Sequence, residues 1–133
     1  MLACLVSGKQ CYRTARDARV TTVAILSFRL GMSDGVSVAA AQWVAALRRM
    51  GCHVRTVAGA GTADHLVPGL ALDSHRPAYA GALAAALRGA DLVVVENVCS
   101  LPMNPPVTEV VAEVWRRGLP GGLRMVDALW VAA

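Results

Sequence analysis

The chain has 133 residues, of which 56% are hydrophobic and 5% aromatic, and its formal net charge is +4. This length suits one compact domain and is too short for two of ordinary size, while the apolar composition excludes a disordered chain. No apolar stretch approaches the roughly 20 residues that span a bilayer, and the first one, residues 2–6, is too short for a signal-peptide core. The sequence therefore predicts a globular cytoplasmic protein without a transmembrane segment.

Most of the excess positive charge lies ahead of the first predicted strand. Four basic residues and one acid fall in this part of the chain, so the rest of the sequence is nearly neutral. Basic clusters that bind nucleic acid usually carry interleaved aromatic residues or a reading helix, and only Tyr12 accompanies this one. We expect no nucleic-acid partner and interpret residues 1–21 as a poorly ordered basic leader. Its charged residues are Lys9, Arg13, Arg16, Asp17 and Arg19.

The cysteines and histidines form no recognisable metal or redox motif. Cys4, Cys11, Cys52 and Cys99 include no Cys-x-x-Cys pair, and no histidine stands at ligand spacing from them. The scattered histidines have no serine, cysteine or aspartate arranged with them for nucleophilic catalysis. The sequence therefore predicts free thiols, no metal site and no cofactor, and it leaves the catalytic residues unknown.

The most informative segment consists of a predicted strand, a turn and a long helix. Residues 23–28 form a Val-, Ile- and Leu-rich run that is typical of a parallel strand covered on both faces. The turn that follows has a glycine at each end, with two good helix N-caps, Ser33 and Asp34, between them. Unpaired backbone N–H groups at a helix N-terminus favour an anionic or strongly hydrogen-bonding ligand, so we expect a ligand at this turn.

The helix predicted after the turn, residues 36–50, is amphipathic and ends at Gly51. Its spacing assigns one stripe of side chains to the core and places Gln42 and Arg49 on the opposite face. The predicted stripe contains Val36, Ala40, Trp43 or Val44, Leu47 and Met50.

The other predicted elements continue the alternation of strands and helices. A tight return leads from the first helix to an alternating strand, which is typical of a βαβ unit. Because a proline removes a ladder hydrogen bond, the segment that contains Pro68 is expected at a sheet edge or in an extended loop. The pattern predicts an α/β fold: a three-layer, Rossmann-like domain with a mainly parallel sheet. These elements are a strand at 54–58, the edge segment at 65–72, a helix at 77–87, a buried strand at 91–97 and a helix at 107–117.

Two motifs stand out in this order of elements. One is the strand end, turn and helix RLGMSDGVSVAAAQWVAALRRMGCHV, and the other is VVVENVCSLPMNP, a strand and its loop. Together they resemble the amino-terminal lobe of a GT-B glycosyltransferase of the family 4 (group 1) type, in which the first motif is similar to the glycine-rich loop after the first strand. The similarity spans about residues 23–117, and the lobe is expected to occupy residues 22–118. It implies a sugar transfer from a nucleotide-sugar donor to an acceptor, with this lobe on the acceptor side of a cleft.

The resemblance also implies a set of substrate-binding residues. The loop residues Gly31, Ser33, Asp34 and Gly35 would line the cleft near the donor's phosphate or the transferred sugar. Polar side chains at the end of the later strand and in its loop would bind acceptor hydroxyls. The alternative is that these residues only cap a helix or form hydrogen bonds with the backbone of their own loop, because Ser, Asp and Asn commonly bond to nearby backbone. The predicted acceptor residues are Glu96, Asn97, Ser100 and Asn104.

The chain departs from the family pattern after the last predicted helix. Residues 119–133 read as a divergent apolar tail, without the strand and His-containing loop that the family would show. We interpret the sequence as an incomplete lobe from a truncated or frameshifted gene product. The alternative is a small protein that pairs with a separate donor-binding subunit through the tail around Trp130. Glycosyl transfer needs both lobes, so we expect the chain to be inactive alone, and peripheral association with a membrane stays compatible with it.

Two other classes of function compete with this interpretation. A generic Rossmann-like nucleotide-binding domain is the first, but the turn lacks Gly-x-Gly-x-x-Gly and the strand at 54–58 ends without an acid to hold a ribose. An interaction module similar to a response regulator is the second. It is disfavoured because no acidic cluster follows the strands, although phosphorylation of Asp34 would support it.

Overall fold

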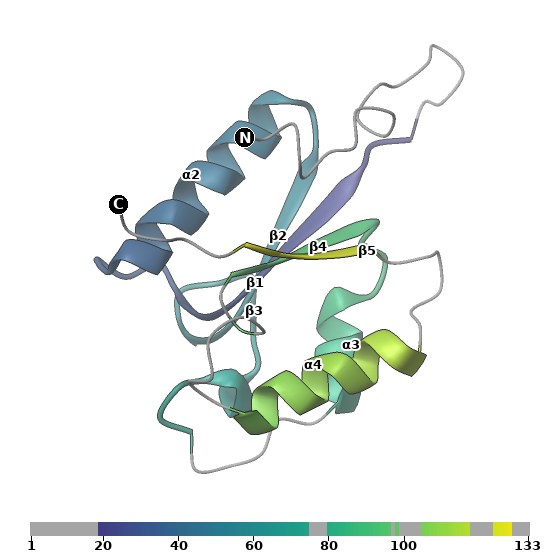
Figure 1. Ribbon diagram of the computed structural model, residues 1–133. Coiled ribbons are helices and arrows are strands. Elements are labelled where there is room, and N and C mark those ends of the chain that lie inside the picture. Colours follow the sequence, from purple (N-terminus) through teal and green to yellow (C-terminus); the bar gives the residue numbers. More distant parts are fainter. Residues whose placement is uncertain (1–18, 75–79, 97, 99–104, 118–123, 129–133) are drawn as a thin grey trace.

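The structure is a computed structural model that describes residues 19–74, 80–96, 98 and 105–117, together with the backbone of residues 124–128. Its strands form one sheet in the order β3-β2-β1-β4-β5, and all the pairings between them are parallel. Helices lie on both faces of this sheet (Figure 1). The predicted α/β class with a parallel sheet is confirmed, and the strand order is compatible with a Rossmann-like fold. The strands are β1 (Thr22–Leu30), β2 (His53–Gly61), β3 (His65–Leu66), β4 (Leu92–Glu96) and β5 (Arg124–Ala128).

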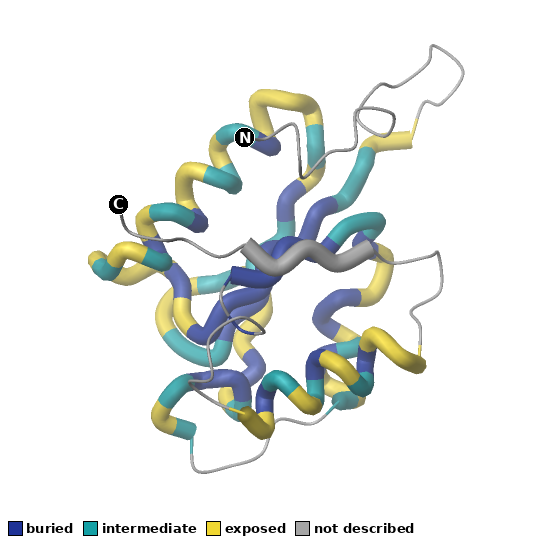
Figure 2. The backbone as a smooth tube through the Cα atoms, viewed as in Figure 1, coloured by how far each residue is buried: buried dark blue, intermediate teal, exposed yellow. Residues whose placement is uncertain are grey.

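The central strand β1 is buried along almost its whole length. It pairs with β2 along one edge and with β4 along the other. Helices cover both of its faces. This position explains why the predicted run of apolar residues lacks alternation. The strand is longer than predicted at both ends, because pairing with β2 continues from Thr22 to Leu30. Figure 2 shows the resulting buried centre of the sheet.

Helix α2 (Gly35–Arg49) covers one face of the sheet, against β1 and β2. The predicted position of the helix is confirmed, with Asp34 as its N-cap and Gly51 just beyond its end. Ala40 and Leu47 are buried as predicted, and Trp43 and Val44 pack partly against the same cluster. The prediction for Met50 was wrong: the residue is 46% exposed, because the helix ends before it and Met50 is the C-cap.

The opposite face of the sheet is covered by α3 (Ala80–Leu87) and α4 (Pro105–Arg117). Leu83 and Leu87 of α3 and Val111 and Val114 of α4 share one buried cluster with the β1 side chains that point to this face. The predicted helix at 77–87 begins within the described residues at Ala80, since 75–79 lie outside them. The predicted helix at 107–117 is confirmed and begins two residues earlier, at the prolines.

The sequence predicted the segment at one edge of the sheet and missed the strand at the other. The segment around Pro68 was expected at an edge, and it forms the two-residue edge strand β3 and a single 3-10 turn, Pro68–Leu70. The segment assigned to a divergent tail contributes Arg124–Ala128 as β5, which pairs in parallel with β4 and extends the sheet. In the part of the chain that the structure describes, no helix is long and apolar enough to cross a membrane.

Candidate functional site

The candidate site lies where the direction of the chain through the sheet reverses. From β1 the chain passes through α2 to β2 on one face, whereas from β4 it passes through α4 to β5 on the other face (Figure 1). β1 and β4 are neighbours, so their carboxyl ends diverge into opposite layers. Open parallel sheets bind their ligands at such a switch point, outside the carboxyl ends of the strands. We use "switch point" below for the carboxyl ends of β1 and β4 and the start of α2.

Asp34 is held at the switch point by three groups. The Ser37 N–H and the Ser37 hydroxyl donate to its carboxylate at 3.1 and 2.8 Å, and the Arg29 guanidinium lies 3.4 Å away. Burial favours the neutral carboxyl, but these hydrogen bonds and the nearby Arg29 charge outweigh it, so the pKa of Asp34 lies below its usual 3.8. Asp34 is therefore an anionic cap at the positive end of α2.

Two polar side chains lie buried beneath this cap. Ser27 and Glu96 are register partners on β1 and β4, and both have no exposed surface. Ser27 alternates with Leu26 and Phe28, which face α3 and α4, so its hydroxyl faces the α2 layer. Glu96 faces the same layer, because Val94, two residues before it, packs with Val23 and Ile25. The residues that precede this pair, 23–26 of β1 and 92–95 of β4, are all apolar.

The predicted loop residues have unlike environments. Ser33 is exposed and makes no hydrogen bond with the described residues. Gly31 has a φ of 68°, and a Cβ placed on it would lie 2.8 Å from the Cβ of Thr62, so this glycine is required by the backbone and by the close approach of the chain after β2. Gly35 has open space around it and no positive φ. Its lack of a side chain leaves room at the start of α2.

The structure brings some of the predicted site residues together. Glu96 ends β4, Gly31 and Asp34 lie on the turn that follows the neighbouring strand β1, and Gly35 begins α2. Three other predicted residues lie outside the described residues, namely Asn97, Ser100 and Asn104.

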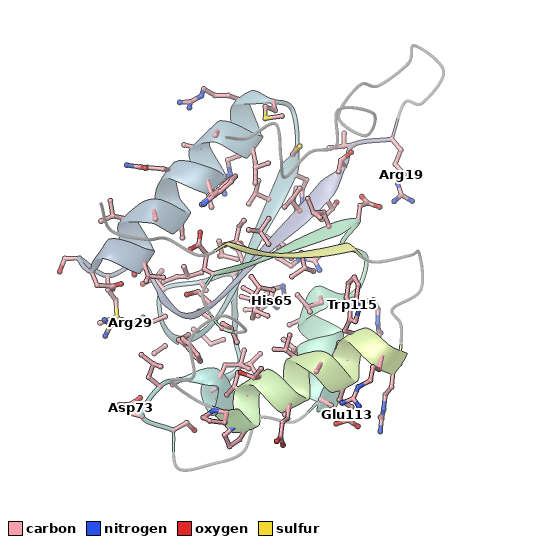
Figure 3. The ribbon with its side chains drawn as sticks, in the orientation of Figure 1. Arg19, Arg29, His65, Asp73, Glu113 and Trp115 are labelled. Carbon is pink, nitrogen blue, oxygen red and sulfur yellow. The ribbon has the colours of Figure 1, made fainter. Side chains whose placement is uncertain are left out.

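Three residues of the site were missed by the sequence analysis: Ser27, Arg29 and Ser37. A usable signal existed for Ser27 and Arg29, since they are the only polar residues between Val23 and Leu30. Ser37 stands three residues after a strong N-cap, where a hydroxyl can reach the capping carboxylate. Figure 3 shows Arg29 at the carboxyl end of β1, near the start of α2.

A second aspartate is bound in a similar way away from the switch point. The N–H and the hydroxyl of Thr56 donate to the Asp64 carboxylate at 2.8 and 3.0 Å, and the Asp64 N–H donates back to the Thr56 hydroxyl at 2.9 Å. The Thr56 N–H is the main cause that lowers the pKa of Asp64, and it outweighs burial. This pair ties the residue before the edge strand β3 to β2.

The two bound aspartates predict how stability depends on pH. Because the folded state depresses both pKa values, the unfolded chain takes up protons first, so the free energy of unfolding should fall as the pH drops through 3.8 and below. Urea unfolding at neutral pH and at a series of acidic values measures this. Asp64→Asn should lessen the drop, and Asp73→Asn, which changes an exposed carboxylate, should leave it unchanged. An equal drop in all three proteins would contradict the assignment.

Across residues 19–74, 80–96, 98 and 105–117, no three His, Cys, Asp or Glu side chains are placed to hold an ion. Cys52 is half-buried beside the α2 cluster. No protein-family model, no curated protein and no solved structure matches the chain.

Proposed function

We propose that this chain forms the acceptor-side lobe of a GT-B type glycosyltransferase and binds the hydroxyl groups of a sugar at the switch point. The resemblance of its two motifs to that family supports the proposal. The observation that carries it is the Asp34 carboxylate, which occupies the N-terminus of α2 at the position where Rossmann-like domains bind ligands.

The charge at the helix start distinguishes sugar binding from dinucleotide binding. A dinucleotide places its pyrophosphate at the N-terminus of the first helix, where backbone N–H groups and the helix dipole attract the negative charge. Here the Asp34 carboxylate already accepts the Ser37 N–H, so a pyrophosphate would meet a like charge. Sugar hydroxyls donate hydrogen bonds to carboxylates, and they are attracted by the same group.

The buried polar pair supports a role for this end of the sheet beyond packing. Burying a hydroxyl and an acid costs free energy that apolar residues would not cost. The preceding positions, 23–26 of β1 and 92–95 of β4, carry apolar residues, whereas Ser27 and Glu96 lie further toward the carboxyl side of their strands. Buried polar residues at positions where apolar residues would pack better tend to mark functional positions. We place Ser27 and Glu96 under the site as positioning residues for the turn above them.

Backbone amide shifts in NMR test the proposal. The probes are neutral methyl glycosides of glucose, mannose and galactose, with NAD⁺ and UDP for comparison. We expect at least one glycoside at tens of millimolar to shift the amides from Gly31 to Ser37. Shifts there with NAD⁺ alone would establish the nucleotide-binding alternative, and no shift with any glycoside would reject the proposal.

Two replacements of Asp34 separate its capping role from its charge. Asn is as good an N-cap as Asp, so Asp34→Asn should change the free energy of unfolding by no more than a few tenths of a kcal/mol, whereas Asp34→Ala should lower it by about 1 kcal/mol. Both variants should weaken the glycoside shifts, because both lose the carboxylate. Asp73→Asn removes an exposed carboxylate elsewhere and is the control. Unchanged glycoside shifts in Asp34→Asn would limit Asp34 to capping.

Transfer itself requires a second lobe in this proposal. The leaving nucleotide must be stabilised while the acceptor is held in line, and the two tasks are divided between facing lobes. We therefore expect these 133 residues alone to show no sugar transfer from UDP-glucose or GDP-mannose. Measurable transfer by the purified chain would disprove the assignment to an acceptor-side lobe.

A further inference from the structure

The end of the molecule opposite the switch point is strongly basic. Because the strands are parallel, the three helices all end at the amino edge of the sheet, where β1 begins. The last turns of α2 and α4 carry pairs of arginines, and another arginine follows α3. We name this end the amino-edge surface. Its described arginines, all exposed, are Arg19, Arg48, Arg49, Arg88, Arg116 and Arg117.

The positive charge of this surface is only partly neutralised. Within the described part of the chain, Arg19 pairs with Asp91 and Arg117 pairs with Glu113. The other four arginines have no acidic group within salt-bridge distance there. Cations at helix C-termini are favoured by the helix dipole, which accounts for their position on each helix. It does not account for apolar side chains that are exposed among them.

Three large apolar side chains are exposed on the same surface. Val20 precedes β1 and is 46% exposed, Met50 follows α2 at 46%, and Trp115 lies in the last turn of α4 at 42%. Arg19 and Trp115 lie on the side of the molecule away from Arg29 (Figure 3). Exposed Trp and aliphatic side chains combined with arginines are typical of surfaces that bind the headgroup region of a membrane.

We propose that the amino-edge surface docks on a membrane that contains anionic lipids. The arginines would bind lipid phosphates, and Val20, Met50 and Trp115 would enter the boundary between headgroups and acyl chains. This orientation points the switch point away from the membrane into water. Nucleic acid also attracts arginines, but it offers no apolar layer for the three exposed side chains, so the membrane is the better fit. The inference does not depend on the proposed function.

Co-sedimentation of the full chain with vesicles tests the arginines. We expect binding to vesicles of phosphatidylcholine with phosphatidylglycerol, little binding to phosphatidylcholine alone, and loss of binding in high salt. Replacing Arg48, Arg49 and Arg116 by glutamine should weaken binding about 100-fold, since basic residues near an anionic surface contribute almost independently. The leader is unchanged in this variant, so the loss is assigned to the surface. Equal binding by the variant would overturn the proposal.

A pair of methionines tests the apolar part of the surface. Met50→Ser changes the amino-edge surface, and Met32→Ser changes a methionine of similar exposure, 49%, on the turn at the switch point. Only Met50→Ser should weaken vesicle binding, while circular dichroism confirms that both proteins fold. Equal effects of the two changes would contradict the placement. Binding to a DNA duplex without binding to vesicles would show that the basic surface recognises nucleic acid instead.

Discussion

Gly61→Ala should lower the free energy of unfolding by about 3 kcal/mol, from backbone strain and overpacking together. Gly61 ends β2 with a φ of 85°, a left-handed conformation that side chains rarely adopt. A Cβ on this residue would lie 1.9 Å from the carbonyl oxygen of Leu30, which is backbone and cannot turn aside. The chain at this point supports the turn of the site, because the Thr62 N–H donates to the same Leu30 oxygen at 2.9 Å.

Gly35→Ala is the matched control for this effect. It lies on the same edge of the sheet, but its φ is not positive and no atom lies within 4 Å of its Cβ position. Its replacement should leave stability unchanged or raise it by up to about 1 kcal/mol, through the loss of flexibility in the unfolded chain. Urea unfolding measures both variants. Similar stabilities for the two alanine variants would show that the close approach of β2 to Leu30 does not occur.

Ser27→Ala should raise the free energy of unfolding by about 1 to 2 kcal/mol, whereas Gly61→Ala should lower it. The Ser27 hydroxyl is fully buried and has no hydrogen-bond partner among the residues that the structure describes. Removing it replaces an unsatisfied polar group by an apolar one of similar size. If the hydroxyl serves the site, the same variant should also weaken the glycoside shifts.

Ser37→Ala provides the comparison, because Ser37 is also a buried serine in the layer of α2. Its hydroxyl donates to Asp34 at 2.8 Å, so its removal should lower stability by about 1 kcal/mol. Opposite signs for the two serine variants, measured by urea unfolding, distinguish an unsatisfied hydroxyl from a bonded one. A loss of stability in Ser27→Ala would mean that its hydroxyl has a partner in solution.

The helices and strands were largely predictable because their signals are local. The apolar run of β1, the cap at Asp34 and the glycine after α2 each act within a few residues, and they fixed β1 and α2 to within two residues. Met50 was wrongly assigned to the core because the helical spacing was extended one residue beyond Arg49, where α2 ends. The strand β5 was missed because a short segment gains its strand conformation from pairing with β4.

The sequence by itself determined the class of the fold, the buried central strand and the turn at which a ligand is expected. It could not determine which residues share the site, because that depends on strand order and register. Only the tertiary structure placed Ser27 beside Glu96, 69 positions later in the chain, and put Arg29 within 3.4 Å of Asp34. It also brought the ends of three helices to one basic surface. Local propensity acts along the chain, whereas sites and surfaces are made by contacts across it.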